Sequence, residues 1–395
     1  MPINTVRDKN PTILISLLFL LIPLDYVFPH IGNATVVTII SIVIIVYGFF
    51  YVLIRKKGKL YLSNGSLAIV FLGMVFLISF LWAINQHVVW SRFVSVANTI
   101  LLFIIIIQFR FDKKSIIMVE NAAILGATIL TIYVLTKVNL SLVYAGYRLK
   151  FSQLGSEYFS DPNGLAARVM FPLIIAINRV FYSKRKIIIP LYSILIVGFS
   201  YILLLSASRA SIIALAIAAF FFILQGFEKK KGWILIGFMI LLVLFSFAPR
   251  FLPEHITQRV FNLEKYREVA EIEGDRIDIW KHVVLDLFFS SPLWGYGGGC
   301  SSYALAQFYG RLKAVHNSYL MILCELGLLG FVPWMYFVMR QIKESFNLRK
   351  FSTTILPATA AVLFMAMTLD AFTEKYLWSI FVYIYIVKSC FTENK

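Results

Sequence analysis

Charged residues are scarce in this chain of 395 residues, because Asp, Glu, Lys and Arg together make up only 14% of it. Soluble domains contain about a quarter charged residues. Hydrophobic residues reach 60%, and the mean hydropathy is +0.82. This composition excludes a soluble enzyme, a disordered tail protein and a disulfide scaffold, and it predicts an all-α polytopic membrane protein.

Cysteine is scarce as well, and the three cysteines, Cys300, Cys324 and Cys390, lie far apart. Their spacing fits neither a zinc site nor a disulfide framework. The predicted outer loops contain no D-x-D motif, so a nucleotide-sugar metal site is unsupported. The lack of a G-x-S-x-G motif and of a Cys/His pair gives no support to a hydrolase. We therefore expect no metal and no cofactor.

Long apolar runs are what the chain does have. A membrane-spanning helix needs about 20 largely apolar residues, and windows of that length predict about twelve transmembrane helices, with eleven as the alternative. The polar start MPINTVRDKNP and the absence of an A-x-A cleavage site predict a retained first span rather than a signal peptide. The spans are predicted at 12–29, 35–54, 65–84, 93–109, 115–138, 163–181, 187–205, 210–226, 233–249, 317–339, 353–372 and 376–391.

The basic residues indicate the sidedness of these spans. If the N-terminus is inside, the inner segments hold 22 basic and five acidic residues, which accounts for the whole net charge of +17. The short outer loops hold only Arg92, Arg209 and Lys375 as basic residues. This distribution follows the positive-inside rule and predicts that both termini are cytoplasmic. The charge therefore faces anionic inner-leaflet lipid and does not indicate nucleic acid.

Two outer segments are longer than the rest and organise the chain. Residues 1–249 would contain spans one to nine with a smaller outer loop at 139–162. Residues 250–316 would form a large helical extracytoplasmic loop before the tenth span, and residues 317–395 would contain spans ten to twelve. No internal repeat is visible, which weakens an inverted-repeat transporter.

Two arginines occupy unusual outer positions. Arg209 lies in SASRA at the outer edge of the membrane, where it either snorkels or holds an anion. Arg276 follows the predicted N-cap Asp275, where a cation opposes the helix dipole unless it binds a phosphate. The alternative is that Arg276 pairs with Glu273 or stacks on Trp280. An apolar stripe at helical spacing follows it: Ile277, Trp280, Val284, Leu287 and Phe288.

The next polar positions surround the start of the tenth span. Asn317 or Ser318 can cap this helix, which places His316 at an outward-facing helix start. The positive field there favours anions and a neutral imidazole that can accept a proton. The glycines at 295–299 are interpreted mainly as a structural turn. Glu325 is interpreted as a buried hydrogen-bonding residue. Asp370, near the outer end of its span, is a natural partner for an arginine or a residue reaching water.

Several short motifs follow one another in a fixed order. They are DPNGLA at 161–166, S-x-S-R ending at Arg209, G-x-R-x-x-x-W around Arg276, G-x-G at 295–297, and H-N-x-x-L-x-x-x-x-E-x-G-x-x-G at 316–330. With about twelve spans and a large outer loop before the tenth, this series resembles the O-antigen ligase and O-antigen or capsule polymerase superfamily over essentially the whole chain.

The resemblance implies a metal-independent membrane glycosyltransferase that acts on the outer leaflet of the bacterial cytoplasmic membrane. Its donor would be an oligosaccharide on undecaprenyl diphosphate. Its partners would be a glycan acceptor, the lipid bilayer and a chain-length regulator, but no nucleic acid. The implied catalytic residues are Arg209 and Arg276 on the diphosphate, His316 as base or acceptor-positioner, and Asp370 orienting an arginine or the histidine. The substrate-binding candidates are Arg148, Arg311, Lys313, Asn317 and Asn163.

The acceptor stays open at this point. A polymerase would pass the glycan to another lipid-linked repeat unit, and a ligase would pass it to lipid A-core. The form H-N-S-Y-L-x-I-L-x-E-L-G-L-L-G favours the polymerase slightly. A transporter of lipid-linked oligosaccharide is the rival from another class, but it would need charged residues lining a cavity within the spans.

Overall fold

The computed structural model describes residues 10–25, 27–28, 34–137, 149, 161–183, 185–228, 250, 252–261 and 276–391. Throughout these residues the regular secondary structure is helical, without a β-strand. The expected all-α fold of a polytopic membrane protein is therefore confirmed.

The helices follow one another along the chain. The longer ones are α1 (Asn10–Leu21), α2 (Val36–Arg55), α3 (Asn64–Ile78), α4 (Gln86–Ile106), α5 (Lys113–Lys137), α7 (Pro162–Tyr182), α8 (Ile189–Leu205), α9 (Arg209–Glu228), α15 (Ser318–Leu348), α16 (Ile355–Ala366) and α17 (Lys375–Phe391). The shorter ones are η1 (Ile22–Leu24), η2 (Ser79–Leu81), η4 (Lys186–Ile188), α11 (Glu254–Phe261), α13 (Arg276–Lys281), the π-helix η6 (His282–Phe288) and α14 (Ser301–Tyr309).

Eight helices of the described residues are long and apolar enough to cross a membrane. Two shorter apolar helices, Pro11–Leu24 and Ile355–Ala366, coincide with the spans predicted at 12–29 and 353–372. Helix α17 covers the span predicted at 376–391. The span predicted at 233–249 lies outside the described residues, so a total of about twelve stays a prediction.

Helix α4 departs from its predicted span, because it begins at Gln86 rather than near residue 93. The side chain of Asn85 caps it by accepting a hydrogen bond from the Val88 N–H at 3.3 Å. The first two turns contain polar residues, which a hydropathy window rejects although the backbone is helical. As a consequence, Arg92 lies on a helix rather than in a loop.

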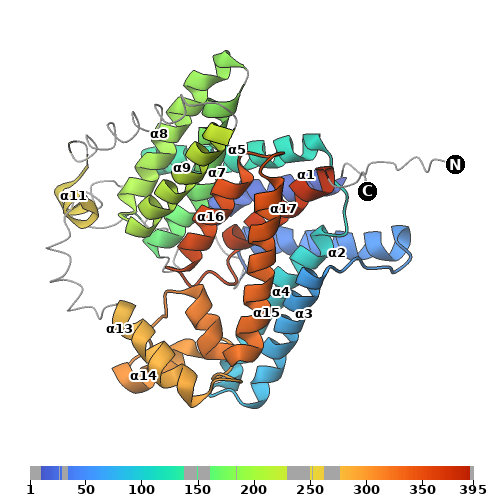
Figure 1. Cartoon of the computed structure of the whole chain (residues 1–395), viewed down its shortest axis with the longest axis vertical. Helices are drawn as coiled ribbons and strands as arrows, with labels where there is room; N and C mark the ends of the chain where they lie inside the picture. Colours follow the sequence, from blue (N-terminus) through green and yellow to red (C-terminus); the bar gives the residue numbers. More distant parts are fainter. Residues whose placement is uncertain are drawn as a thin grey trace.

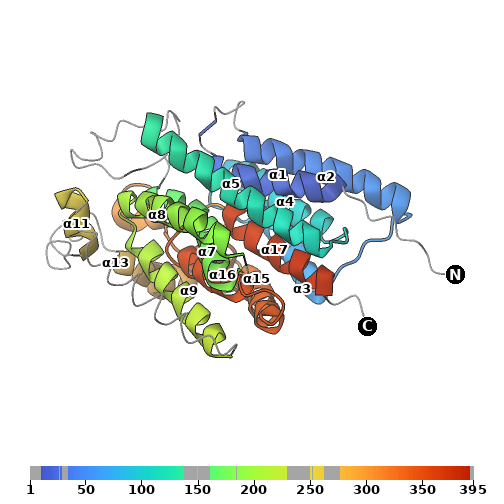
Figure 2. The same ribbon diagram turned by 90° about the horizontal axis from the view of Figure 1, so that it is seen from above.

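Contacts between helix starts and helix ends define one end of the bundle. At one end, the hydroxyl oxygen of Thr12 in α1 lies 3.0 Å from the hydroxyl oxygen of Ser115 in α5. At the same end, the Nζ atom of Lys388 in α17 lies 2.8 Å from the Oε1 atom of Glu344 in α15. Both views place the start of α1 and the end of α17 on one side of the molecule and α11 on the opposite side (Figures 1 and 2). We call the opposite end, where α7, α9 and α15 begin, the site end.

Helix α7 forms the centre of the bundle. Its most apolar stretch is 78% buried, compared with 28% for α2 and 22% for the stretch Lys186–Leu205 that contains α8. Helix α7 packs against α5, α8, α9 and α16. Large apolar side chains such as Ile54 and Ile194 are exposed on the peripheral helices, as expected for surfaces that face lipid rather than water.

The close contact between α1 and α5 requires a glycine at position 126. A Cβ atom on Gly126 would overlap the main-chain carbonyl of Leu20. We expect Gly126→Val to separate these helices and to lower the free energy of unfolding by ~1–3 kcal/mol. The measurement is the midpoint of thermal unfolding in detergent. Leu125→Ala, at a half-exposed neighbouring position of α5, is the control, and an equal loss in both variants would contradict the close approach.

Candidate functional site

Helix α15 begins where a polar segment enters the apolar core. The Oδ1 atom of Asn317 accepts hydrogen bonds from the N–H groups of Tyr319 at 3.0 Å and Leu320 at 3.2 Å. These bonds satisfy two of the donors that a helix start leaves unpaired, and they confirm the predicted cap. His316 has a φ of 53°, which is uncommon for a residue other than glycine. Its side chain is half-buried beside the helix start.

The loop Met367–Glu374, between α16 and α17, is fastened to the start of α15 by Ser318. The fully buried Ser318 hydroxyl donates to the carbonyl of Leu369 at 2.6 Å and accepts from the N–H of Ala371 at 2.7 Å. One side chain therefore pairs two main-chain groups of the loop. This arrangement fixes the position of Asp370 between them.

Asp370 lies directly against the turn that leads into α15. Its Oδ1 atom accepts a hydrogen bond from the Asn317 N–H at 3.2 Å. Burial raises the pKa of the Asp370 carboxyl, while the neighbouring His316, the main-chain donors of the turn and Arg92 act in the opposite direction. The structure thus brings His316, Asn317 and Asp370, three residues selected from the sequence, into one cluster.

Arg276 joins this cluster from the segment before α15. It is the first residue of α13, it is half-buried, and its Nη1 atom donates to the carbonyl of Thr368 at 3.4 Å. The indole of Trp280, one turn later, donates to the carbonyl of Val315 at 2.9 Å, next to His316. Helix α13 therefore contacts both the loop Met367–Glu374 and the residue before His316. Residues 273–275 lie outside the described residues, so a pairing with Glu273 stays untested.

Arg209 lies at the same end of the bundle. It is the first residue of α9 and follows a tight turn in which Ala207 has a φ of 47°. Near the other end of α9, the side chain of Gln225 donates to the carbonyl of Thr353, which precedes α16, at 3.4 Å. The two helices pack against each other and run in opposite directions. Arg209 therefore lies level with the end of α16, where the loop Met367–Glu374 begins.

The glycine run at 295–299 pairs with a break in α15. Gly327 has φ 57° and ψ −155°, which interrupts the helix, and the carbonyl of Glu325 accepts from the N–H of Gly297 at 2.8 Å instead. The carboxylate of Glu325 is buried and accepts from the hydroxyl of Ser301 at 2.7 Å. Both interpretations from the sequence, a structural turn and a buried hydrogen-bonding glutamate, are therefore confirmed.

The apolar stripe predicted from Ile277 onward is wrong in part. Ile277 is 56% exposed, and the buried face consists of Ile279, Val283 and Leu287. The helix changes from α to π geometry at His282. The buried positions recur every four residues, so they differ by one position from the predicted Trp280 and Val284, while Leu287 is buried as predicted.

Asn163 shapes the start of α7. Its side-chain amide donates to both oxygens of the Asp161 carboxylate, at 2.8 and 3.1 Å. Asp161 is the N-cap of the helix and accepts from the Asn163 N–H at 2.9 Å. A contact between Asn163 and substrate stays a prediction.

The remaining substrate-binding candidates lie between α14 and α15 or outside the described residues. Arg148 belongs to the residues that the structure does not describe. Arg311 is exposed after α14. The ammonium group of Lys313 lies 5.8 Å from the ring centroid of Tyr309, a cation–π contact.

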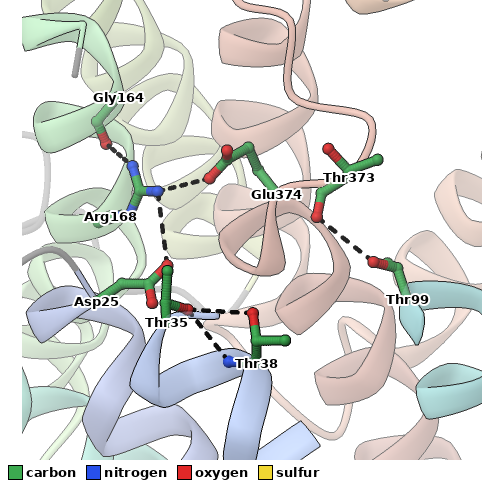
Figure 3. A network of polar contacts seen from close by, with 8 residues as sticks. All are labelled: Asp25, Thr35, Thr38, Thr99, Gly164, Arg168, Thr373 and Glu374. Atoms are coloured by element: carbon green, nitrogen blue, oxygen red, sulfur yellow. Dashed lines mark hydrogen bonds and ion pairs between the residues drawn. The ribbon is translucent and has the colours of Figure 1, made fainter. Parts of the chain in front are cut away.

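Arg168 is an interior charge that the sequence analysis did not select. It is 4% exposed, its Nη2 atom donates to Glu374 at 2.5 Å and lies 3.8 Å from Asp25, and its Nη1 atom donates to the carbonyl of Gly164 at 3.0 Å (Figure 3). An arginine six residues into an apolar span is costly unless it is paired. That rule alone would have selected Arg168.

Arg92 was also missed as a site residue. Its charge acts on both Asp370 and Glu325. The sequence feature that could have identified Arg92 is its place among the three basic residues of the predicted short outer loops.

The arrangement suits an anionic ligand. Helix α15 presents its start, Arg276 and Arg92 lie near the same loop, and Arg209 lies at the same end. Fixed guanidinium groups and a helix start bind phosphate well, and a histidine beside them can accept a proton. Within the described residues, no three His, Cys, Asp or Glu side chains are grouped as metal ligands.

Comparison with known proteins finds similarity to one family model in residues 193–335. Residues 193–335 match the family model described as O-Antigen ligase. The chain is also 26% identical over 180 residues to a protein of Rickettsia conorii named "Putative polysaccharide ligase". That alignment covers 42% of this chain and 41% of the Rickettsia protein, so it spans less than half of the relative's length. The family match includes Arg209, Arg276 and His316.

The attachment of the loop to α15 can be tested through Ser318. Ser318→Ala leaves the Leu369 carbonyl and the Ala371 N–H without their partner, so we expect a loss of ~1–3 kcal/mol in the free energy of unfolding. The measurement is the thermal unfolding midpoint of the purified protein. Ser290→Ala, at an exposed serine, should leave that midpoint nearly unchanged. Equal midpoints for wild type and Ser318→Ala would contradict the described contacts.

Proposed function

Since the chain falls within the O-antigen ligase and polymerase superfamily, we propose that it is a membrane glycosyltransferase that polymerises oligosaccharide repeat units linked to undecaprenyl diphosphate. The observation that carries this proposal is the convergence of Arg276, His316 and Asp370 on one loop beside the start of α15. The reaction would take place on the outer leaflet of the bacterial cytoplasmic membrane, with both termini of the protein in the cytoplasm.

The leaving group of this reaction is the lipid diphosphate. As the bond between the sugar carbon and the diphosphate oxygen breaks, negative charge develops on that oxygen. Arg276 and Arg209 would bind the diphosphate and stabilise this charge, since guanidinium pairs with phosphate through two parallel hydrogen bonds. They would supply the positive charge that a metal ion supplies in other glycosyltransferases, so we propose a metal-independent reaction without a cofactor.

The nucleophile is a hydroxyl group of the acceptor sugar. Its oxygen forms the new bond to the donor sugar carbon, and its proton passes to the imidazole of His316, which acts as general base. Asp370 lies against His316 and would stabilise the imidazolium that results. The two carboxylate oxygens of Asp370 can serve the main-chain donors and the histidine at the same time.

Further residues would contact the glycan around this centre. Arg148, Arg311 and Lys313 are proposed to bind its polar or anionic groups. Asn317 and Asn163 would contribute through the helix starts that their side chains shape. A chain-length regulator would act as a protein partner in the membrane.

The second candidate is a ligase that transfers the finished glycan to lipid A-core. The description of the matched family and the name of the Rickettsia relative favour it. Both reactions use the same donor and the same leaving group, so the site serves either one. The acceptor distinguishes them.

The roles of the site residues can be tested in a strain that lacks the gene. We expect Arg209→Ala, Arg276→Ala and His316→Ala to reduce polymer formation at least about 100-fold, because each removes charge stabilisation or proton transfer in the transition state. The measurement is the ladder of polymer lengths on a gel, at equal protein levels. Arg185→Ala, at an exposed arginine on the opposite side of the bundle, is the control. Full-length polymer from all three site variants would contradict the mechanism.

The acceptor can be tested with purified protein. Lipid-linked repeat units as the only substrate should yield oligomers with one undecaprenyl diphosphate released for each bond formed, and added EDTA should leave the rate unchanged. A ligase would form no product until lipid A-core is added. Product formation that depends on lipid A-core would overturn the polymerase in favour of the ligase.

A further inference from the structure

Arg92, in the second turn of α4, lies against the main chain of Gly299. A Cβ atom on Gly299 would lie 2.7 Å from Cγ and 3.2 Å from Cβ of Arg92, so any larger residue would displace the arginine. Gly299 also has a φ of 77°, which favours glycine. The last glycine of the run therefore leaves room for the aliphatic stem of Arg92.

The charge of Arg92 acts on the surroundings of the α15 start. Its guanidinium interacts electrostatically with Asp370 and with Glu325. Arg276 donates to the carbonyl of Thr368, two residues before Asp370. Helix α4 reaches the loop Met367–Glu374 through the hydroxyl of Thr99, which donates to the carbonyl of Thr373 at 3.4 Å, so α4 and α13 approach this loop separately.

The guanidinium of Arg92 keeps its donors available. Its side chain is exposed. The ion pairs of the described residues use other cations, namely Arg168, Arg179, His282 and Lys388. Lys375, the first residue of α17, differs because it donates to the hydroxyl of Thr99 at 2.6 Å. An arginine has five N–H donors in a planar fork, which fits a phosphate.

The main chain before Arg92 is held in place by hydrogen bonds to residues 296–298. The Ile84 N–H donates to the carbonyl of Tyr296 at 3.2 Å, and the Gly298 N–H donates to the hydroxyl of Ser79 at 2.9 Å. These bonds fix the corner between η2 and α4 against the glycine run. Arg92 is thus positioned before any ligand arrives, which lowers the entropy cost of binding.

We propose that Arg92 binds a phosphate of the undecaprenyl diphosphate donor, as a third guanidinium beside Arg276 and Arg209. This inference rests on the proposed function, because it assumes a diphosphate at the α15 start. Arg92 and Arg276 would add positive charge around Asp370, which favours binding of a diphosphate. Arg92 lies outside the family match at 193–335, so helix α4 would add a binding residue from a different part of the chain.

The test measures binding of radiolabelled undecaprenyl diphosphate, without glycan, to the full chain in nanodiscs of phosphatidylcholine. Arg92→Gln should raise the Kd about tenfold, which corresponds to the loss of one charged hydrogen-bond donor. Arg92→Lys should raise it less, because it keeps the charge. Arg185→Gln is the matched control and should leave the Kd unchanged. The thermal unfolding midpoint of each variant is measured alongside.

A second measurement uses the wild-type protein and does not depend on the folding of a variant. Phenylglyoxal modifies exposed arginines, and mass spectrometry reports the extent at Arg92. Saturating undecaprenyl diphosphate should reduce this modification about tenfold while leaving Arg185 modified. Unchanged modification of Arg92 would overturn the proposal.

The outcomes distinguish a failure of the proposed role of Arg92 from a failure of the proposed function. If Arg276→Gln weakens binding but Arg92→Gln does not, the role of Arg92 is wrong and the proposed function stands. If wild-type protein shows no saturable binding, the proposed function fails together with the role of Arg92. If phosphatidylglycerol in the nanodiscs removes the difference between wild type and Arg92→Gln, the phosphate belongs to bulk phospholipid and the proposal is overturned.

Discussion

The structure depends on one constraint, that a charge inside the bundle must have a partner within the protein. Lipid offers none, and an unpaired ion in hydrocarbon is too costly to retain. The Nη2 atom of Arg179 forms an ion pair with Glu120 Oε2 at 2.8 Å, and the Nη2 atom of Arg168 forms one with Glu374 Oε2 at 2.5 Å. These pairs neutralise interior charges, and the arginines proposed to bind the ligand lie at the site end of the bundle. Chemistry is therefore concentrated at one end of the bundle.

The loop Met367–Glu374 is where these separate requirements meet. Glu374 pairs with Arg168 of α7, Asp370 and its neighbours pair with the start of α15, and the Thr368 carbonyl accepts from Arg276. Eight residues thus connect a central helix, an outer segment and a helix start that are far apart in the sequence. Interior stability and site geometry share the same loop, so a change that loosens one is expected to loosen the other.

Hydropathy predicted most of the fold because each span satisfies its own main chain and needs only apolar length. The cap at Asn317 and the hydrogen-bonding role of Glu325 were predictable for the same local reason. The pairing of Arg168 with Glu374 crosses 206 positions of sequence, and no local pattern encodes it. The π-helix at His282 and the polar first turns of α4 also escaped prediction, because periodicity and hydropathy windows assume uniform α-helices.

The break of α15 at Gly327 has a practical consequence for work on this protein. The segment 292–299 hydrogen-bonds to the carbonyl and N–H groups around the break, with Leu328 N–H to Pro292 at 2.8 Å and Gly297 N–H to Glu325 at 2.8 Å. These two bonds fix the number of residues between them, so this segment cannot accept an insertion or a deletion. An epitope tag or a fluorescent label belongs instead at Gly58, which has open space around it and the exposed neighbours Lys57 and Lys59.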